Sequence, residues 1–354
     1  MAPIHHFTSL TSLLVLFILF HPGLARTRNL AALVEEHPLV LKYHNGLLLK
    51  GNVTINLLWY GEFSPNQRSI ILDFLNSLSS SETLMEPSVS SWWKTTGRYM
   101  GGPVTVVVGN QVFDGEYSVG KSLTTDQLAI LSSKAGPIKN TVNVVLTSHE
   151  VVIDGFCMTK CGTHSSVITE SGNLAYAWVG NSVRQCPEQC AWPFHKPMQI
   201  PPSPPEPFKP TIYTPPFPRL VPRSLERTMH SPPIPQSVRW PFDRPIYSPK
   251  IAPLIPPNND VGIDGMIMNL ATVLAGTVTN PFNNGYFEGP ANAPLEAVSA
   301  CPAIFGKGSY PGYPGQVLVD KSRGASYNAH GINGRKFLLP AMWDPQASAC
   351  TTLT

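Results

Sequence analysis

The sequence predicts an α+β fold, in which a mixed central β-sheet is flanked by helices and followed by a loop-rich C-terminal region. Three observations support this prediction. Short runs of β-branched and aromatic residues indicate strands, and amphipathic stretches between them indicate helices. Residues 285–354 are rich in Gly, Pro, Asn and Tyr, which is typical of irregular structure. Strands separated by helices and followed by loops fit a single mixed domain.

Four segments are predicted strands. They are Val53–Tyr60 (VTINLLWY), Val104–Val108 (VTVVV), Val142–Leu146 (VNVVL) and Ala175–Val179 (AYAWV). The second and third runs are continuously apolar, which is typical of central strands that are covered on both faces. We therefore expect these two strands in the middle of the sheet.

Three helices are predicted. The first begins at Ser64, because Ser64 can cap the helix, Pro65 suits the first helical position and Gln67 completes a capping box. The second is expected over Pro87–Tyr99, which contains two tryptophans. The third is expected over Asp264–Gly276, where the final glycine fits a C-cap.

The amino-terminal residues 1–25 have the pattern of a secretory signal peptide. Leu10–Phe20 forms an apolar run, and the small residues before and at Ala25 suit cleavage after that position. The run is shorter than the roughly 20 residues that a membrane-spanning helix needs. No later stretch is predicted to span a bilayer, so we expect a soluble extracellular protein without stable membrane insertion.

A proline-rich insertion is predicted over residues 195–257. Of the 37 prolines, 21 lie between Pro193 and Pro257, so this stretch is expected to be extended or disordered. It would divide one domain into residues 26–194 and 258–354. The phrase Trp192–Pro197 (WPFHKP) recurs as Trp240–Pro245 (WPFDRP). Two interpretations stay open: a genuine insertion bounded by a duplication, or an error in the gene model such as a retained intron.

The cysteines are expected to form disulfides, because an even number in a secreted chain favours oxidised pairs. Six are present, and sequence alone does not choose among the 15 possible pairings: Cys157, Cys161, Cys186, Cys190, Cys301 and Cys350. A zinc site would require the first four as thiolates with His164 or His195 beside them. We favour disulfides, with both histidines in structural hydrogen bonds.

The segment Asn52-Val53-Thr54 is a candidate glycosylation site on Asn52. It lies at the beginning of the first predicted strand, which weakens the signal. The sequence does not have the charge pattern of a nucleic-acid-binding protein. Its net charge is +3, its charged fraction is 13%, and it has no basic run with interleaved aromatics.

Motifs that would indicate catalysis are incomplete. His149-Glu150 would begin a zinc-protease helix if a histidine stood at position 153, but Ile153 stands there and the surrounding residues indicate a strand and its exit. There is no G-x-S-x-G elbow, and the phosphate-loop-like Gly306–Ser309 lacks the required earlier glycine. Neither a cofactor nor a catalytic residue is therefore predicted.

Several long motifs resemble the plant EXORDIUM-like, or phosphate-induced, protein family. They include KYHNGLLLKGNVTINLLWYG, GFCMTKCGTH, CPEQCAWPFHKP, DVGIDGMIMNLATVLAGTVTNPFNNGYFEGP and GINGRKFLLPAMWDP. The resemblance covers the mature chain except about 48 extra residues after the CAWPF motif. It implies a secreted protein of the apoplast or cell wall with a role in cell expansion and growth responses linked to brassinosteroid, and it implies no biochemical activity.

A more distant resemblance suggests a degenerate zincin-like scaffold. TVLAGTVTNP is similar to the HExxEAxTDP helix of some zinc metalloproteases. In that alignment Thr272 replaces the first zinc ligand, Val273 the catalytic glutamate and Gly276 the second ligand. A hydroxyl, an isopropyl group and a hydrogen atom cannot hold zinc or activate water.

Three functional hypotheses follow. The first is a non-catalytic extracellular protein that binds a cell-wall component or a cell-surface receptor and promotes growth. The second is a secreted hydrolase with an unrecognised, metal-assisted site built from Cys157, Cys161, His164, Cys186 and Cys190. The third is a structural wall protein that acts through its proline-rich arm. The missing catalytic motifs favour the first.

Overall fold

The computed structural model describes residues 39–80, 82, 84–136, 140–169, 172–194 and 253–354. The predicted signal peptide, with its cleavage site after Ala25, lies outside these residues, as do His195 and most of the proline-rich insertion. The described residues from Leu39 to Thr354 form one compact unit.

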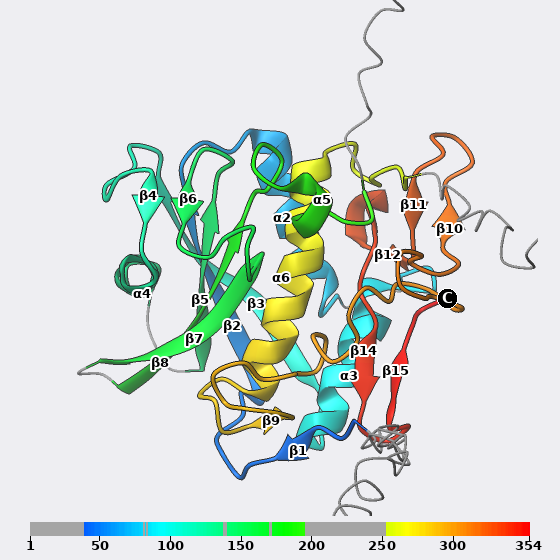
Figure 1. Cartoon of the computed structure of the whole chain (residues 1–354), viewed down its shortest axis with the longest axis horizontal. Helices are drawn as coiled ribbons and strands as arrows, with labels where there is room; N and C mark the ends of the chain where they lie inside the picture. The colour runs from blue at the N-terminus through cyan, green and yellow to red at the C-terminus, as the bar shows by residue number, and fades with distance from the viewer. Residues whose placement is uncertain (1–38, 81, 83, 137–139, 170–171, 195–252) are drawn as a thin grey trace, which may run out of the picture. The chain divides into compact units, whose positions relative to one another are not determined.

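A five-stranded mixed sheet forms the centre of this unit (Figure 1), which confirms the predicted mixed sheet with flanking helices. Its order is β3-β2-β5-β8-β7, with β3, β2, β5 and β8 mutually parallel and β7 antiparallel at one edge. The strands are β2 (Gly51–Tyr60), β3 (Val104–Asp114), β5 (Thr141–Thr147), β7 (Gly162–Thr169) and β8 (Gly172–Gly180).

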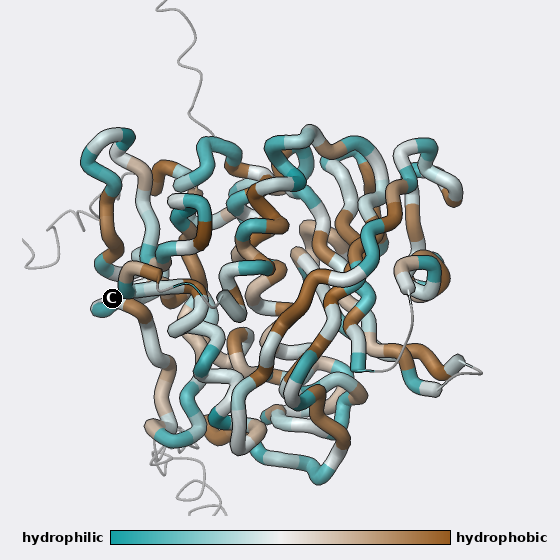
Figure 2. The backbone as a smooth tube through the Cα atoms, turned by 180° about the vertical axis from the view of Figure 1, so that it is seen from behind, coloured by the Kyte–Doolittle hydropathy of each residue, from teal (hydrophilic) through white to brown (hydrophobic). Residues whose placement is uncertain are grey.

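Helices cover both faces of the sheet. They are α2 (Pro65–Ser77), α3 (Val89–Met100), α4 (Thr125–Ser133), α5 (Pro187–Cys190) and α6 (Val261–Thr279). Alternate residues of β2 show the division: Ile55 and Leu57 pack in the core with α2, α3 and α6, whereas Leu58 packs with α4. Figure 2 shows hydrophobic residues along the strands and α6, with hydrophilic residues in many connecting loops.

The predicted beginning of the first helix is confirmed. Ser64 accepts a hydrogen bond from the Gln67 amide, and the Gln67 side chain accepts one from the Ser64 amide. The second helix begins at Val89 because Ser88 caps it. Neither α4 nor β7 is among the predicted elements, although Thr124 and Gln127 form a capping box of the same kind before α4.

The placement of Val104–Val108 as a central strand is wrong. This segment begins β3, which is the edge strand of the sheet, and Val107 is 50% exposed. Val104 and Val106 supply the core-facing side of the strand, with relative exposures of 5% and 6%. A short apolar run is compatible with either position, and here one of its faces meets solvent. The corresponding prediction for Val142–Leu146 is confirmed, because every residue of β5 is buried.

The long helix α6 corrects two expectations. It continues through Gly276 to Thr279, so Gly276 is an interior residue and Asn280 is the C-cap. By length and composition α6 is also apolar enough to cross a membrane, contrary to the expectation that no later stretch would be. Because 89% of an 18-residue apolar stretch of α6 is buried inside the protein, α6 is the central core helix.

Asp264 anchors the beginning of α6. Its carboxylate accepts hydrogen bonds from the amide of Asn258, at 2.9 Å, and from its side chain, at 2.7 Å. Complete burial raises the pKa of Asp264 to about 7 in spite of these hydrogen bonds. The segment before α6 is therefore tied to a titratable group inside the core.

The remaining described elements are short. They are β1 (Lys42–Tyr43), β4 (Ser122–Leu123), β6 (Val152–Ile153), β9 (Tyr286–Phe287), β10 (Leu318–Val319), β11 (Ser326–Tyr327), β12 (Ala329–His330), η1 (Ile332–Gly334), β13 (Lys336–Phe337), β14 (Met342–Asp344) and β15 (Ala349–Thr351). Two-residue and three-residue strands joined by loops agree with the loop-rich C-terminal region that the composition predicts.

Three disulfides join all six cysteines: Cys157–Cys186, Cys161–Cys190 and Cys301–Cys350. The first two connect the GFCMTKCGTH segment to α5 and to the residue before it, because each cysteine of one C-x-x-x-C pair is joined to one of the other pair. The ends of the proline-rich insertion lie together, because Phe194 and Leu254 form a parallel bridge. A long segment can leave and rejoin the domain there without separating its two halves.

Candidate functional site

The three positions aligned with the zinc-protease motif lie on α6 and are used for packing. The Thr272 hydroxyl donates to the carbonyl of Met268 at 2.9 Å. Val273 is 6% exposed and faces Gly162 of β7. A Cβ atom at Gly276 would lie 2.6 Å from Oε2 of Glu296 and 2.9 Å from Nε2 of His164. The space beside Gly276 is thus occupied by the protein's own side chains.

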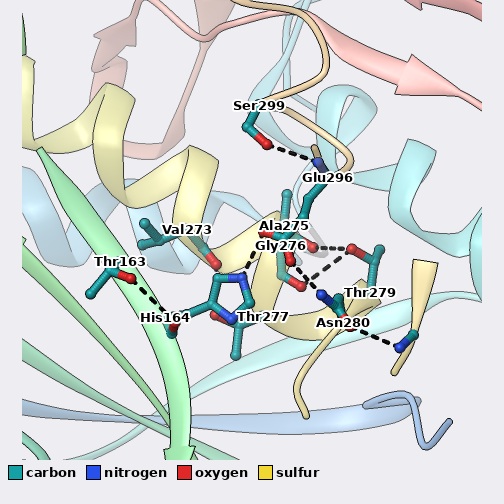
Figure 3. Close-up of polar contacts among 11 residues, drawn as sticks. Thr163, His164, Val273, Ala275, Gly276, Thr277, Thr279, Asn280, Glu296 and Ser299 are labelled. Carbon is teal, nitrogen blue, oxygen red and sulfur yellow. Dashed lines mark hydrogen bonds and ion pairs between the residues drawn. The ribbon is translucent and has the colours of Figure 1, made fainter. Parts of the chain in front are cut away.

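The polar network of His164, Glu296 and Asn280 is here called the α6 cluster (Figure 3). Nε2 of His164 lies 2.7 Å from Oε2 of Glu296, and Nδ2 of Asn280 donates to Oε1 of the same carboxylate at 2.6 Å. Oδ1 of Asn280 accepts from the Gly285 amide, so strand, helix end and loop are joined. Only Nδ1 of His164 is left without a hydrogen-bond partner in this cluster. The prediction that His164 is a structural, hydrogen-bonded histidine is confirmed.

The cysteines are not brought together as metal ligands. Cys157, Cys161, Cys186 and Cys190 are oxidised in disulfides, so none offers the thiolate that binds zinc. Among the described residues, no group of three or more His, Cys, Asp or Glu side chains is arranged to hold a metal ion. The metal-assisted site proposed for these cysteines and His164 therefore has no structural support.

A second polar region lies at the carboxyl ends of the parallel strands. The chain leaves β2 for β3 on one side and then crosses to β5 on the other side of β2. In open α/β sheets this reversal creates a crevice outside the strand ends, where ligands commonly bind. A crevice of about 540 Å³ is found there, and we call it the carboxyl-end crevice. It is lined by Gly61, Glu62, Phe63, Ser64, Gln67, Arg68, Phe113, Gly115 and His149.

Two buried polar atoms near the crevice have no hydrogen-bond partner in the described structure. They are Oγ of Ser148, a residue only 1% exposed, and Nε2 of His149, which lies 3.9 Å from Oε1 of Glu150. Ser148 lies behind Gly61, because a Cβ atom at Gly61 would be 2.3 Å from the Ser148 hydroxyl oxygen. Gly61 also has a φ of +92°, so both its backbone and its close approach to Ser148 require glycine. Unpaired buried polar atoms are costly and uncommon, which marks this place as a candidate site.

His149-Glu150 follows β5 in a loop, as the sequence predicts, and Glu150 is the residue after the crevice residue His149. It accepts hydrogen bonds from Lys121 at 2.6 Å and from the Tyr117 hydroxyl at 2.9 Å. The hydrogen bond from Lys121 is the main reason that the pKa of Glu150 is lowered, and the same bond raises the pKa of Lys121. The opposite charges of Lys121 and Glu150 thus offset each other.

A larger hollow of about 790 Å³ lies along α3 and the loop after α2. Residues 81 and 83 of that loop are outside the described residues, so we build no site on it. Asn52, the candidate glycosylation position, is exposed at the beginning of β2, where its side chain is accessible. Its modification stays a prediction.

Sequence reasoning missed most of the carboxyl-end crevice. It singled out His149 and Glu150 for a metal motif, but it did not connect them with Glu62, Arg68 or Phe113. The predicted strands end at Tyr60, Val108 and Leu146, whereas the observed strands end at Tyr60, Asp114 and Thr147. The residues after these observed ends meet because the strands are parallel. Glu296 of the α6 cluster carried no comparable local signal.

Comparison with known proteins finds similar proteins in plants. A sequence model described as the phosphate-induced protein 1 conserved region matches residues 41–214 and 231–353. Protein EXORDIUM-like 2 of Arabidopsis thaliana is 52% identical over 330 residues, which cover 91% of this chain and 92% of that protein. Protein EXORDIUM of the same plant is 46% identical over 341 residues, with 92% and 93% covered.

Protein PHOSPHATE-INDUCED 1 of Nicotiana tabacum is also 46% identical, over 339 residues that cover 92% of this chain and 93% of that protein. No solved structure matches the chain significantly. The family model leaves only residues 215–230 unmatched between its two ranges, which is a narrower departure than the sequence suggested.

Proposed function

This chain belongs to the phosphate-induced protein 1 family, and from that premise we propose that it is a secreted, non-catalytic binding protein of the apoplast and cell wall. It holds a cell-wall component or a cell-surface receptor in the carboxyl-end crevice and needs no cofactor. Through that contact it promotes cell expansion in growth responses linked to brassinosteroid.

The observation that carries the proposal is the open crevice at the strand ends, whose lining includes His149. Nε2 of His149 has no hydrogen-bond partner within the described structure. A ligand that is hydrogen-bonded to this atom would satisfy a group whose isolation is otherwise unfavourable. By contrast, the positions on α6 that would carry zinc chemistry are filled by Thr272, Val273 and Gly276, which supports binding rather than hydrolysis.

The disulfides support the extracellular compartment. All six cysteines are paired, and such bonds persist in oxidising compartments rather than in the cytosol. Mass measurement of purified protein before and after reduction should show a gain of two hydrogen atoms for each of the three disulfides. Free thiols in the unreduced protein would count against this compartment.

The decisive experiment follows the full chain in plant cells. The tagged protein should be recovered from the extracellular fluid or the wall fraction, with an amino terminus at Arg26. Purified protein added to elongating cells in the presence of brassinosteroid should increase their final length, and protein unfolded by reduction and alkylation should not. Recovery only inside cells, or equal growth with folded and unfolded protein, would contradict the proposal.

A further inference from the structure

We propose that the carboxyl-end crevice binds a neutral, hydroxyl-rich ligand, namely a segment of an uncharged oligosaccharide. This inference rests on the proposed function, because it names the chemical class that the binding protein holds.

Phe113 provides an exposed aromatic face. It is the last but one residue of β3, lines the crevice and is 60% exposed. Its ring stacks on Trp59 with an interplanar angle of 7° and a centroid distance of 6.4 Å. The Arg68 guanidinium lies 5.4 Å from the centroid of the same ring. Neighbours on two elements therefore hold Phe113 in place, and a fixed aromatic face suits the apolar C–H face of a sugar ring.

The polar atoms of the crevice match hydroxyl groups. A hydroxyl can donate and accept at the same time, so it can pair with Nε2 of His149 whether that atom donates or accepts. Glu62 is exposed and offers carboxylate acceptors, whereas Arg68 offers guanidinium donors. One donated hydrogen bond from Arg68, to the carbonyl of Phe63, fixes its position. Neighbouring hydroxyls of a sugar could be bound by this mixture of donors and acceptors.

The charges in the lining disfavour charged ligands. Glu62 and Arg68, which line the crevice, have opposite charges. Lys121 forms an ion pair at 2.6 Å with Glu150, the residue after His149. An anion would meet Glu62, and a cation would meet Arg68. Either ligand would therefore be bound against one repulsive contact at short range.

The beginning of α2 does not form a phosphate site. Pro65 at the first helical position has no amide hydrogen, and the Gln67 amide already donates to the Ser64 side chain. The Ser64 amide donates to the Gln67 side chain at 3.0 Å. Of the amides that bind phosphate at other helix beginnings, that of residue 65 is absent and those of Ser64 and Gln67 are occupied here. The aromatic ring and the mixed polar atoms of the crevice favour a neutral sugar instead.

Isothermal titration of the full mature protein tests the inference. The probes are cellohexaose and a xyloglucan heptasaccharide as neutral ligands, with hexagalacturonate and inorganic phosphate as anionic ligands. Saturable binding of at least one neutral probe is expected, and neither anion should bind more tightly. Phe113→Ala and Glu62→Gln should each weaken that binding by about tenfold, because a stacked ring or a charged acceptor is lost. The matched control is Tyr310→Ala, an aromatic that is 53% exposed and lies outside the crevice, and it should change binding less than twofold.

Three results would overturn the inference. They are no saturable binding of either neutral probe up to about 10 mM, tighter binding of an anion, or neutral binding that both crevice variants leave unchanged while remaining folded by circular dichroism. These outcomes are separate from the test of the proposed function. A wall-retained, growth-promoting protein that fails to bind the sugars would contradict only the ligand class. A sugar-binding protein found only inside cells would contradict only the function.

Discussion

The α6 cluster and the carboxyl-end crevice each contain a histidine and a glutamate, but these side chains differ in their hydrogen bonding. In the α6 cluster, the carboxylate of Glu296 is bonded to both His164 and Asn280. In the crevice, Nε2 of His149 has no hydrogen-bond partner and Glu62 is exposed. The α6 cluster, in which only Nδ1 of His164 lacks a hydrogen-bond partner, stabilises the fold, whereas an open crevice is available to a ligand. The difference places the candidate site at the strand ends, away from the helix that resembles a zinc-protease motif.

This comparison predicts that mutations in the two regions have different effects on stability and on ligand affinity. Changes in the α6 cluster should lower stability and leave ligand affinity unchanged in the folded protein. Changes in the crevice should lower affinity and leave stability nearly unchanged. The following predictions run from the largest expected effect to the smallest.

Glu296→Ala should lower the free energy of unfolding by about 4 kcal/mol, because it leaves His164 and Asn280 buried without their common acceptor. Urea unfolding with the disulfides intact measures this loss. Glu188→Ala removes an exposed glutamate from α5 and serves as the matched control, with an expected change below about 0.5 kcal/mol. Equal effects of the two variants would mean that the α6 cluster is not structural.

Stability should increase as the pH falls from 8 to 5, because Asp264 has a pKa of about 7 in the folded protein against 3.8 for the unperturbed group. The folded state therefore takes up a proton in this range while the unfolded state does not. The stabilisation from this group is complete below the unfolded pKa and is lost as the pH rises through the folded value. We expect a gain of roughly 3 kcal/mol over this interval, measured by urea unfolding at each pH. In Asp264→Asn the dependence should largely disappear, and an unchanged slope would rule out Asp264 as its source.

Gly276→Ala should lower the free energy of unfolding by about 1–2 kcal/mol. Alanine usually stabilises a helix interior by up to about 1 kcal/mol relative to glycine, but the added Cβ must displace Glu296 or His164. Thermal unfolding measures the net effect. Gly102→Ala is the control, because its Cβ would meet no atom within 4 Å and its backbone is not left-handed. A stabilised Gly276→Ala protein would show that the cluster has room beside α6.

Phe113→Ala should lower the free energy of unfolding by less than about 1 kcal/mol, because this side chain is 60% exposed. The same variant should still lose about tenfold in oligosaccharide affinity. Unfolding and titration on one protein preparation give both values. A large loss of stability would make Phe113 part of the core and would remove its use as a probe of binding.

Much of the fold follows from local sequence signals. The capping box of Ser64 and Gln67 and the apolar run of β5 depend on neighbouring residues, and both predictions are confirmed. The sequence predicts a helix end at Gly276, which is wrong. Glycine is needed there because His164 and Glu296, which lie far away in sequence, approach the helix closely at this position. Val107 was placed in the interior because an apolar run does not reveal whether a strand has a second neighbour.

The candidate site was harder to predict because its residues are separated along the chain and come together only through strand order. Glu62, Phe113 and His149 follow or end three different strands. No spacing rule connects them, and only the parallel pairing of β2 with both β3 and β5 brings them to one edge. The disulfide pairing had the same limitation, because six cysteines permit many pairings until the loop at 155–161 is packed against α5.

The most direct test compares two isosteric changes, Glu62→Gln and Glu296→Gln, by titrating both proteins with the neutral oligosaccharide and unfolding both in urea. We predict that Glu62→Gln weakens binding about tenfold at unchanged stability. Glu296→Gln should bind like the unaltered protein while losing about 1–2 kcal/mol of unfolding free energy. If instead Glu296→Gln loses binding at full stability and Glu62→Gln binds normally, the site lies at α6 and our assignment of the two regions is wrong.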